Sequence, residues 1–555
     1  MLLAVASLCG LSTAHAEPVS FEWFEYAGRD AAFSAPLPAG NFHNPILAGY
    51  YPDPSVTRVG DTYYLVNSTF AHWPGIPIHE SKDLVHWTLI GHALSDPSKV
   101  SFDGLNISRG VFAPAIDHHD GKFYIVNTLV DAGGNFFVTA TNPAGPWSEP
   151  TWLPSVDGID PSFFFDDNGK AYVINNGPPV ETPRYEGHRA IWIQEFDVAA
   201  RKLIGPRKLI VNGGVDLTKR PIWIEAPHIF KRDGTYYLIC AEGGTADQHS
   251  EVVFRSQSVM GPYVPYSANP ILTQRHLDAA RPFPVETTGH ADFVATPNGD
   301  WWAVFLGTRN YGRDLWNTGR ETFLLPVTWV DGWPTILTGQ ATVPYVHARP
   351  NLSRQAAAAV PHSGNFSVRD EFDAPALAPY WEMLRTPRER WYDLTSVRGS
   401  LTLRARPESL SGRGQPSFLG RRQQHGSATA STAMWYVPAR AGDRAGIVAF
   451  HNESHYYFLG LVHNGTAPVL ELRRRAWRGE TGDSVVASVP ITVSPRTPLY
   501  LQIRARQDRV DFLYATKPNA WQTLVADADG TILSTKVAGG FVGTMFGLYA
   551  YRDSR

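Results

Sequence analysis

The sequence predicts an all-β protein, a five-bladed β-propeller followed by a β-sandwich. Two observations predict the propeller. A strand-like segment, a turn glycine and a second aromatic strand recur five times, and successive turn glycines are 61, 48, 65 and 65 residues apart. That spacing leaves room for roughly four strands per repeat, the content of one propeller blade. A third observation, alternating apolar and polar residues in strand-like runs after residue 365, predicts the sandwich.

The five repeats share one plan. They begin at Asp53, Phe112, Asp160, Glu225 and His290, and their turn glycines are Gly60, Gly121, Gly169, Gly234 and Gly299. Asp-Gly and Asn-Gly between apolar runs signal hairpins, because the turn needs positive φ. The first residue lies nine positions before the glycine in four repeats and seven before it in the Asp53 repeat. Because the first strand of a blade lies nearest the propeller axis, we expect these five first residues to form one ring.

Three of the five expected ring residues are carboxylates: Asp53, Asp160 and Glu225. Carboxylates brought together repel one another and resist removal from water, so the arrangement is costly unless it performs chemistry. The alternative is that these residues only begin strands, with Asp-Pro and Ala-Pro as turn initiators.

The chain of 555 residues is too long for one core and is expected to divide into domains. Residues 1–16 are apolar and end in Ala14-His15-Ala16, which predicts an export signal without its basic start. Export places the protein in the periplasm or outside the cell, and 16 residues are too few for a membrane span. Residues 17–350 are assigned to the propeller, 351–364 to an Ala-, Ser- and Pro-rich linker and 365–555 to the sandwich.

Charge and composition narrow the class of partner. The formal net charge is −3 and neither sign forms a long block, which excludes a nucleic-acid stripe. Aromatic residues make up 12 % of the chain, with 17 tryptophans, and aromatic faces are common platforms for sugar rings, so the composition favours a carbohydrate. Cys240 is the only cysteine after residue 16, so no disulfide is expected.

Three segments carry a resemblance to a known family. Residues 44–55, 158–167 and 223–228 resemble, in order and spacing, the signature segments of glycoside hydrolase family 43. Residues 289–292, 306–309 and 319–329 extend the resemblance. In the second domain, residues 369–373 and 420–425 resemble the concanavalin-like (jelly-roll) sandwich of the family's β-xylosidases. Two positions depart from the usual pattern: Ala226 often stands as glycine in similar members, and Phe112 as tryptophan.

The resemblance implies an inverting hydrolase with Asp53 as general base, Glu225 as general acid and Asp160 raising the pKa of the acid. Inversion needs room for a water molecule, so the two catalytic carboxyl groups are expected roughly 6.5–9.5 Å apart. The chemistry requires no cofactor. For His290 the resemblance implies either a hydrogen bond near the base or a ligand to a central calcium, although calcium prefers oxygen ligands.

Several other side chains are candidates for substrate binding. The resemblance implies that Arg309 reaches the active site and binds sugar hydroxyls; otherwise it is a surface arginine at a strand end. Phe112 is expected to line the pocket, or else to be a buried aromatic that starts a strand. Trp73 has polar neighbours that suit a pocket rim. Glu242 precedes two glycines that let the backbone pass close to a ligand. His249 either faces the same pocket or lies at the surface, and a surface position is expected.

These observations favour an exo-acting β-xylosidase that releases xylose from the non-reducing end of xylo-oligosaccharides or xylan. The close alternative is an α-L-arabinofuranosidase acting on arabinoxylan or arabinan, or an enzyme with both activities. A retaining fructosidase is disfavoured, since its Asn-Asp-Pro and Glu-Cys-Pro segments are missing. A non-catalytic carbohydrate-binding propeller would lack a ring carboxylate, whereas all three are present. The oligomeric state is left open.

Overall fold

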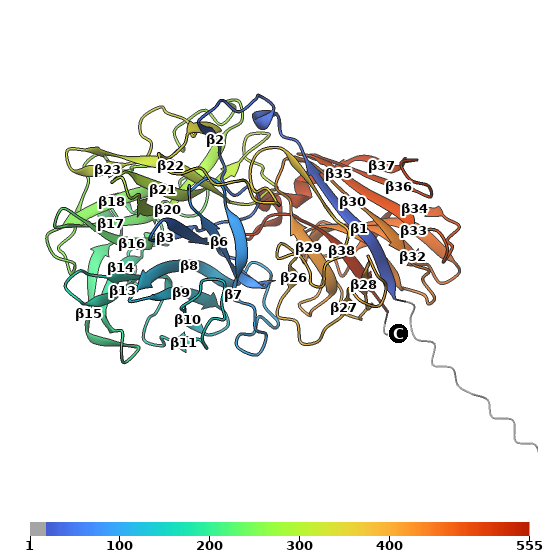
Figure 1. Cartoon of the computed structure of the whole chain (residues 1–555), viewed down its shortest axis with the longest axis horizontal. Helices are drawn as coiled ribbons and strands as arrows, with labels where there is room; N and C mark the ends of the chain where they lie inside the picture. Colours follow the sequence, from blue (N-terminus) through green and yellow to red (C-terminus); the bar gives the residue numbers. More distant parts are fainter. Residues whose placement is uncertain (1–17, 554–555) are drawn as a thin grey trace, which may run out of the picture.

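The computed structural model describes residues 18–553 and consists of two lobes built almost wholly from strands (Figure 1). The prediction of an all-β protein is therefore confirmed. The helical elements among the described residues are short: η1 (Ala31–Phe33), η2 (Leu217–Lys219), η3 (Gly530–Leu533) and α1 (Thr535–Ala538). No helix between residues 18 and 553 is long and apolar enough to cross a bilayer. The export signal expected at residues 1–16 lies outside the described residues.

The first lobe contains five antiparallel sheets of four strands each, and each sheet follows the order of the chain. The first sheet is β3 (Ser55–Val59), β4 (Thr62–Val66), β6 (Gly75–Ser81) and β7 (Thr88–Leu94); the second is β8 (Gly110–His119), β9 (Lys122–Val130), β10 (Gly134–Ala140) and β11 (Thr151–Trp152). The third is β12 (Ile159–Phe165), β13 (Ala171–Gly177), β14 (Ala190–Asp197) and β15 (Lys202–Asn212). The fourth is β16 (Glu225–Arg232), β17 (Thr235–Glu242), β18 (Ser250–Ser256) and β19 (Val264–Pro265); the fifth is β20 (Val285–Ala295), β21 (Trp301–Arg309), β22 (Glu321–Val330) and β23 (Trp333–Thr335). A two-stranded sheet joins β2 (Asn41–His43) to β24 (Val346–Ala348).

The second lobe contains two larger antiparallel sheets. One has the order β27 (Tyr392–Asp393), β28 (Leu401–Leu403), β1 (Val19–Gly28), β30 (Ser427–Trp435), β35 (Leu499–Arg506), β36 (Arg509–Ala515) and β37 (Gln522–Asp529), and β25 (Phe366–Asp370) also pairs with β1. The other has the order β29 (Ser417–Arg422), β38 (Met545–Tyr551), β31 (Arg444–Asn452), β32 (His455–His463), β33 (Pro468–Arg475) and β34 (Ser484–Pro490).

The first strand of the described chain belongs to the second lobe. Strand β1 pairs with β25, β28 and β30, and Figure 1 shows it in blue among the orange strands of that lobe. The assignment of residues 17–350 to one domain is therefore wrong for residues 19–28. The reason is visible in its buried side chains: Val19, Phe21, Phe24 and Tyr26 are at most 2 % exposed and fill the core of the sandwich sheet.

The two lobes share a hydrophobic core. One cluster of buried side chains joins residues of the first two sheets, such as Val66 and Val111, to residues of the sandwich, such as Phe418 and Phe450. Strand β5 (His72–Trp73) also pairs with β26 (Met383–Leu384), so a two-stranded sheet crosses the junction. The expected linker, residues 351–364, packs onto the first lobe as well, since the Ala48 N–H donates to the His362 carbonyl at 2.8 Å. The lobes are thus held together by core packing rather than by a free tether.

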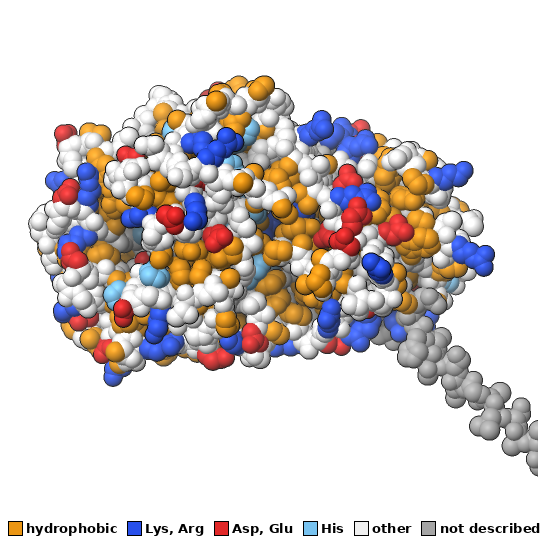
Figure 2. All heavy atoms as spheres, in the orientation of Figure 1, with side chains coloured by type: hydrophobic (Ala, Val, Ile, Leu, Met, Phe, Trp, Pro, Cys, Tyr) orange, Lys and Arg blue, Asp and Glu red, His pale blue; other side chains and the backbone are white. Residues whose placement is uncertain are grey.

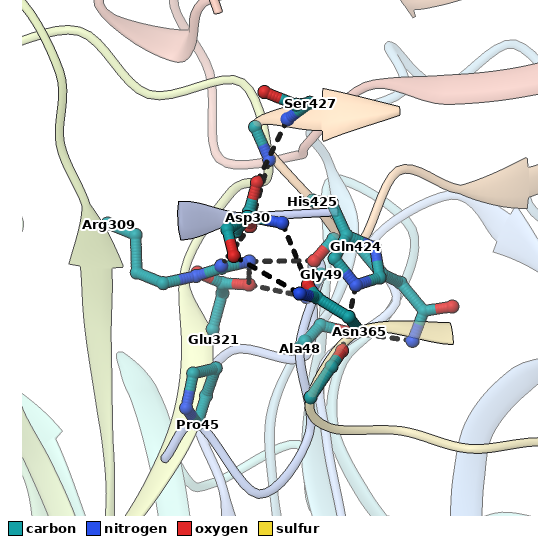
Figure 3. Close-up of polar contacts among 12 residues, drawn as sticks. Asp30, Pro45, Ala48, Gly49, Arg309, Glu321, Asn365, Gln424, His425 and Ser427 are labelled. Carbon is teal, nitrogen blue, oxygen red and sulfur yellow. Dashed lines mark hydrogen bonds and ion pairs between the residues drawn. The ribbon is translucent and has the colours of Figure 1, made fainter. Parts of the chain in front are cut away.

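A buried charge network lies at the junction (Figure 3). Arg309, the last residue of β21, donates from Nε to Glu321 Oε2 and from Nη1 to Asp30 Oδ2, both at 2.6 Å. Its Nη2 donates to the Gln424 carbonyl at 2.7 Å. Asp30 follows β1, and its carboxylate also accepts from the Ser427 N–H at 2.9 Å. Arg309 therefore connects the fifth sheet to two segments of the sandwich lobe.

Charges on the outer surface are arranged differently. On the face shown in Figure 2, basic and acidic side chains are interspersed, without a continuous field of one sign. This agrees with the formal net charge of −3.

The junction network makes a prediction about stability. Replacing Arg309 by Met leaves Asp30 and Glu321 buried without their cation, so we expect a loss of about 3–5 kcal/mol in the free energy of unfolding. Denaturant unfolding followed by tryptophan fluorescence measures it. The matched control is Arg404→Met, which breaks an ion pair with Glu389 that is more than half exposed and should cost about 1 kcal/mol or less. Equal losses in the two variants would contradict a dominant role for the buried network.

Candidate active site

The first strands of the five sheets share an unusual backbone feature at their start. A non-glycine residue in or just before each has a left-handed φ: Asp53 at 52°, Ala113 at 37°, Asp160 at 53°, Ala226 at 51° and His290 at 52°; the fifth strand has a second, Thr287 at 53°. In the second to fifth sheets a break in strand register accompanies it. Such bulges redirect side chains, and strained residues of this kind gather at functional sites at a cost of about 1–3 kcal/mol each.

These five left-handed residues surround a small enclosed cavity of about 10 Å³. Phe112 and Glu225 each precede the left-handed residue of their strand by one position and do not line the cavity. The prediction that all five first residues form one ring is therefore wrong for the second and fourth sheets. Asp53, Asp160 and His290 line the cavity, whereas Phe112 and Glu225 each stand one residue before the residue that lines it.

Asp53 is buried, at 4 % exposure, and closely partnered. Arg320 Nη1 lies 3.0 Å from its Oδ1, His290 Nδ1 lies 3.5 Å from the same oxygen, and Ser68 Oγ donates to its Oδ2 at 2.6 Å. Burial alone would raise the pKa of Asp53, but the charge of Arg320, the neighbouring His290 imidazole and the Ser68 hydrogen bond together outweigh it, so the pKa lies below its usual value. Asp53 is therefore ionised at neutral pH and able to accept a proton.

Asp160 and Glu225 behave in the opposite way. Both are 6 % exposed, and the Ala226 N–H donates to Asp160 Oδ2 at 3.2 Å, which ties the two strands together. Burial and then the charge of Asp53 raise the pKa of Asp160 to about 7. Burial, Asp160 and Asp53 raise the pKa of Glu225 well above its usual value, against the weaker opposing charges of Arg320 and Arg189. Glu225 therefore keeps its proton near neutral pH and can act as an acid.

Histidines surround the ionised carboxylate in their neutral form. Burial lowers the pKa of His290 to about 3 and that of His249 to about 4. His249 is 2 % exposed, and its Nδ1 lies 2.8 Å from the Thr287 carbonyl. The expectation of a surface position for His249 is therefore wrong. Because both imidazoles are neutral, Arg320 is the cation that balances Asp53.

The residues around His290 do not suit calcium. The cavity beside it has room for about one water molecule, and its lining offers the imidazoles of His228 and His290 next to two carboxylates. Calcium takes six to eight oxygen ligands. Between residues 18 and 553 no group of three or more His, Cys, Asp or Glu side chains is arranged to hold a metal ion. A calcium ligand at His290 stays a prediction that this donor set does not support.

Three phenylalanines form an aromatic wall beside Arg320. Phe112 is half-buried, and its ring centroid lies 5.1 Å from that of Phe70 and 5.6 Å from that of Phe541. Phe541 comes from the sandwich lobe, and the Arg320 guanidinium lies 5.6 Å from its ring centroid. The second lobe thus contributes a side chain beside the residues around Asp53.

Two expected binding residues lie elsewhere. Arg309 is held by the junction network of Figure 3, so its assignment as a sugar ligand is wrong; its side chain is 8 % exposed and its partners are protein groups. Trp73 is 3 % exposed, lies in the strand that crosses the junction and packs edge-on against Phe102, so it is a core residue rather than a rim residue.

Glu242 lies near the acid without joining it. Its strand neighbour Ala241 pairs with Glu225, and its own carboxylate accepts from the Val215 N–H at 2.9 Å. Burial raises the pKa of Glu242. Glu242 therefore braces the segment around residue 215, and a contact between it and a sugar stays a prediction.

The sequence interpretation missed Arg320, Ser68 and Phe541. Arg320 stands in Gly319-Arg320-Glu321-Thr322, a segment singled out for its resemblance, but nothing in one sequence distinguishes it from Arg309 as the arginine that faces Asp53. Ser68 and Phe541 lie 15 and 488 positions from Asp53, outside every repeat motif. Only the fold brings them together.

Comparisons with known proteins match both lobes of the chain to proteins of one family. The model of "Glycosyl hydrolases family 43" matches residues 42–334, and that of "Beta xylosidase C-terminal Concanavalin A-like domain" matches residues 369–555. A "Xylosidase/arabinosidase" of Butyrivibrio fibrisolvens is 38 % identical over 92 % of this chain and 96 % of its own length. A "Non-reducing end alpha-L-arabinofuranosidase BoGH43B" of Bacteroides ovatus is 36 % identical over 92 % of this chain and 91 % of its own. The crystal structure of a "GH43_12 retrieved from capybara gut metagenome" superposes with a TM-score of 0.89 at 38 % identity, covering 96 % of this chain and 99 % of that chain.

The ion pair at Asp53 predicts a shift in pH dependence. Replacing Arg320 by Met removes the cation that favours the ionised carboxylate, so the pKa of Asp53 should rise and the acidic limb of the pH profile of kcat/KM should move to higher pH. Arg320→Lys keeps the charge and should shift that limb less. The measurement is kcat/KM on an aryl glycoside between pH 3 and 9. An unchanged acidic limb in Arg320→Met would show that another group sets it.

The donor set around His290 predicts insensitivity to chelation. Dialysis against EDTA should leave kcat/KM and the melting temperature unchanged, because the cavity has room for about one water molecule and too few oxygen ligands for calcium. Activity that disappears with EDTA and returns with added Ca²⁺ would contradict this reading of the site.

Proposed function

The chain belongs to glycosyl hydrolase family 43, and from this premise we propose that it is an exo-acting, inverting β-xylosidase that releases xylose from the non-reducing end of xylo-oligosaccharides. It is a glycoside hydrolase with the two-lobe organisation of relatives named xylosidase/arabinosidase and α-L-arabinofuranosidase. The α-L-arabinofuranosidase and dual-activity alternatives stay open, because those relatives' names carry both activities. The proposed substrates are accordingly xylo-oligosaccharides or arabinoxylan.

One observation carries the proposal: neighbouring carboxyl groups have pKa values shifted in opposite directions. Asp53 is held ionised by Arg320, while Glu225 is held protonated by burial and by the adjacent carboxylates. Pairs of carboxyl groups whose environments separate their pKa values are the mark of acid and base roles in glycoside hydrolysis. A non-catalytic sugar-binding protein has no need of this costly separation.

The proposed reaction follows from these protonation states. Asp53 accepts a proton from a water molecule as the water oxygen attacks the anomeric carbon. Glu225 donates its proton to the glycosidic oxygen as the carbon–oxygen bond breaks, and the released sugar has the inverted anomeric configuration. Asp160 raises the pKa of Glu225 and helps to hold the acid strand through the Ala226 N–H. Ser68 orients Asp53 by donating a hydrogen bond to it, and neutral His290 lies 3.5 Å from its other carboxylate oxygen.

The aromatic wall supports exo action. Phe541 from the sandwich lobe packs against Phe112 and lies beside Arg320, so the second lobe closes one side of the space around Asp53. A space closed on one side accepts a chain end and excludes the middle of a polymer. The flat faces of Phe112 and Phe541 suit the apolar face of a pentose.

We also propose that the five four-stranded sheets are the blades of a five-bladed propeller and that the second lobe is the concanavalin-like sandwich. Strand β3 packs on β8, β8 on β12, β12 on β16, β16 on β20 and β20 again on β3, a cyclic order that supports the first proposal. The family match over residues 369–555 supports the second. Export to the periplasm or the outside of the cell is proposed from the sequence of residues 1–16 alone.

The test is kcat/KM for 4-nitrophenyl β-D-xyloside and 4-nitrophenyl α-L-arabinofuranoside, with the product anomer followed by NMR. We expect the xyloside to be preferred and α-xylose to appear first. Glu225→Ala should lower kcat/KM by about 10²–10⁴-fold. The loss should be smaller with a 2,4-dinitrophenyl leaving group, because that group departs without a proton.

The control variant is Glu195→Ala, a partly exposed glutamate paired with Lys170 on the third sheet, and it should keep wild-type activity. A preference for the arabinofuranoside would replace the proposed substrate but keep the chemistry. Release of β-xylose first would refute inversion, and cleavage of neither substrate would favour the sugar-binding alternative.

A further inference from the structure

A tryptophan and an arginine form a stacked pair beside the acid, and the proposed reaction does not use them. The Arg189 guanidinium lies 4.4 Å from the centroid of the Trp223 ring. Trp223 stands two positions before Glu225 in the chain. Both side chains are half-buried rather than enclosed, and neither belongs to a hydrophobic core cluster of the described chain. The pair is therefore accessible next to a catalytic group.

The backbone holds Trp223 in place at a cost. Its φ is 53°, which is uncommon for a bulky residue. Residues with such strained backbone angles are concentrated at functional sites. The Trp223 N–H donates to the Gly187 carbonyl at 2.9 Å, and the carbonyl of the next residue, Ile224, accepts from Asn176 Nδ2. A Cβ on Gly187 would lie 3.4 Å from the Trp223 ring and 2.9 Å from Ile222. The absence of a side chain at Gly187 thus allows the ring to lie against this loop.

The pair lies on the acid's side of the site. Trp223 stands two positions before Glu225, and Arg189 is close enough for its charge to oppose the rise in the pKa of Glu225. The aromatic wall of Phe112 and Phe541 lies instead beside Arg320, the partner of Asp53. The site therefore has two different flanks, one next to the base and one next to the acid.

The chemistry of hydrolysis gives these flanks different tasks. The general acid protonates the oxygen that departs, so the leaving group extends from the side of the acid. A tryptophan face suits the apolar face of a sugar ring, and a guanidinium keeps several N–H donors for hydroxyl groups even when it stacks on an aromatic ring.

We propose that Trp223 and Arg189 form the leaving-group subsite, in which Trp223 stacks on the sugar next to the cleaved bond and Arg189 binds its hydroxyl groups. The inference rests on the proposed function. It assigns the preference for oligosaccharides over small aglycones to this pair, so the pair determines specificity for the leaving group and not for the released sugar.

The experiment compares two substrates that differ only in the leaving group, xylobiose and β-xylosyl fluoride. Fluoride places no sugar against Trp223. In Trp223→Ala the ratio of kcat/KM for xylobiose to kcat/KM for the fluoride should fall about tenfold or more, the size expected from losing one contact surface. Trp223→Phe should restore part of the ratio, because it keeps a ring face.

The matched control is Trp192→Ala. Trp192 is also half-buried, and Arg207 also stacks on its ring, at 4.1 Å, but it lies on β14 rather than beside Glu225 in the chain. Its ratio should stay within about twofold of wild type. Because Trp223 carries no charge, the pH profile of kcat/KM on the fluoride should keep its shape in Trp223→Ala.

Each other outcome has a definite meaning. Equal losses on both substrates in Trp223→Ala would show that Trp223 does not distinguish the two leaving groups and would overturn the subsite. If the alanine variant does not fold, Trp223→Leu, which fills much of the space without a ring face, replaces it under the same criterion. A wild-type enzyme that cleaves the fluoride but not xylobiose would refute the subsite alone, and one that cleaves neither would refute the proposed function and the subsite together.

Discussion

The structure of the site depends on one constraint: three carboxyl groups are buried within a few residues of one axis and cannot all be ionised. The solution is an unequal division of charge. Arg320 is the cation in contact with Asp53, so one carboxylate keeps its charge. Burial and that charge raise the pKa of Asp160 to about 7 and the pKa of Glu225 well above its usual value. The imidazoles of His290 and His249 are neutral, because burial lowers their pKa values.

Holding Arg320 in place involves the second lobe. The next residue, Glu321, is bound by two nitrogens of Arg309 and also accepts from the Gly49 N–H at 2.6 Å. Gly49 lies four positions before Asp53. One buried carboxylate therefore fixes both the segment that carries the cation and the segment that carries the base. Since Arg309 is in turn fixed by Asp30 and by the Gln424 carbonyl, docking of the sandwich sets the geometry of the ion pair. This is a physical reason for the two lobes to share a core instead of being joined only by a flexible linker.

The sequence predicts the strands well because the signals are local. Turn glycines after Asp or Asn mark four of the hairpins, and the first hairpin is marked by Gly60 followed by Asp61. The failures are of another kind. Strand β1 pairs with partners more than 300 residues away, which no periodicity reveals. The bulges displaced the expected ring by one residue in two strands, because a register break changes which side chain faces the axis without changing the apolar pattern.

The same displacement separates the roles of the ring residues. Asp53, Asp160 and His290 occupy the left-handed position and line a small cavity with room for about one water molecule. In the acid strand that position is Ala226, and Glu225 stands one residue earlier. Glu225 remains close enough for Asp160 and Asp53 to raise its pKa, and it follows directly on the strained segment that carries Trp223. The register break in the acid strand thus takes Glu225 out of line with the two aspartates while it stays within reach of their charge.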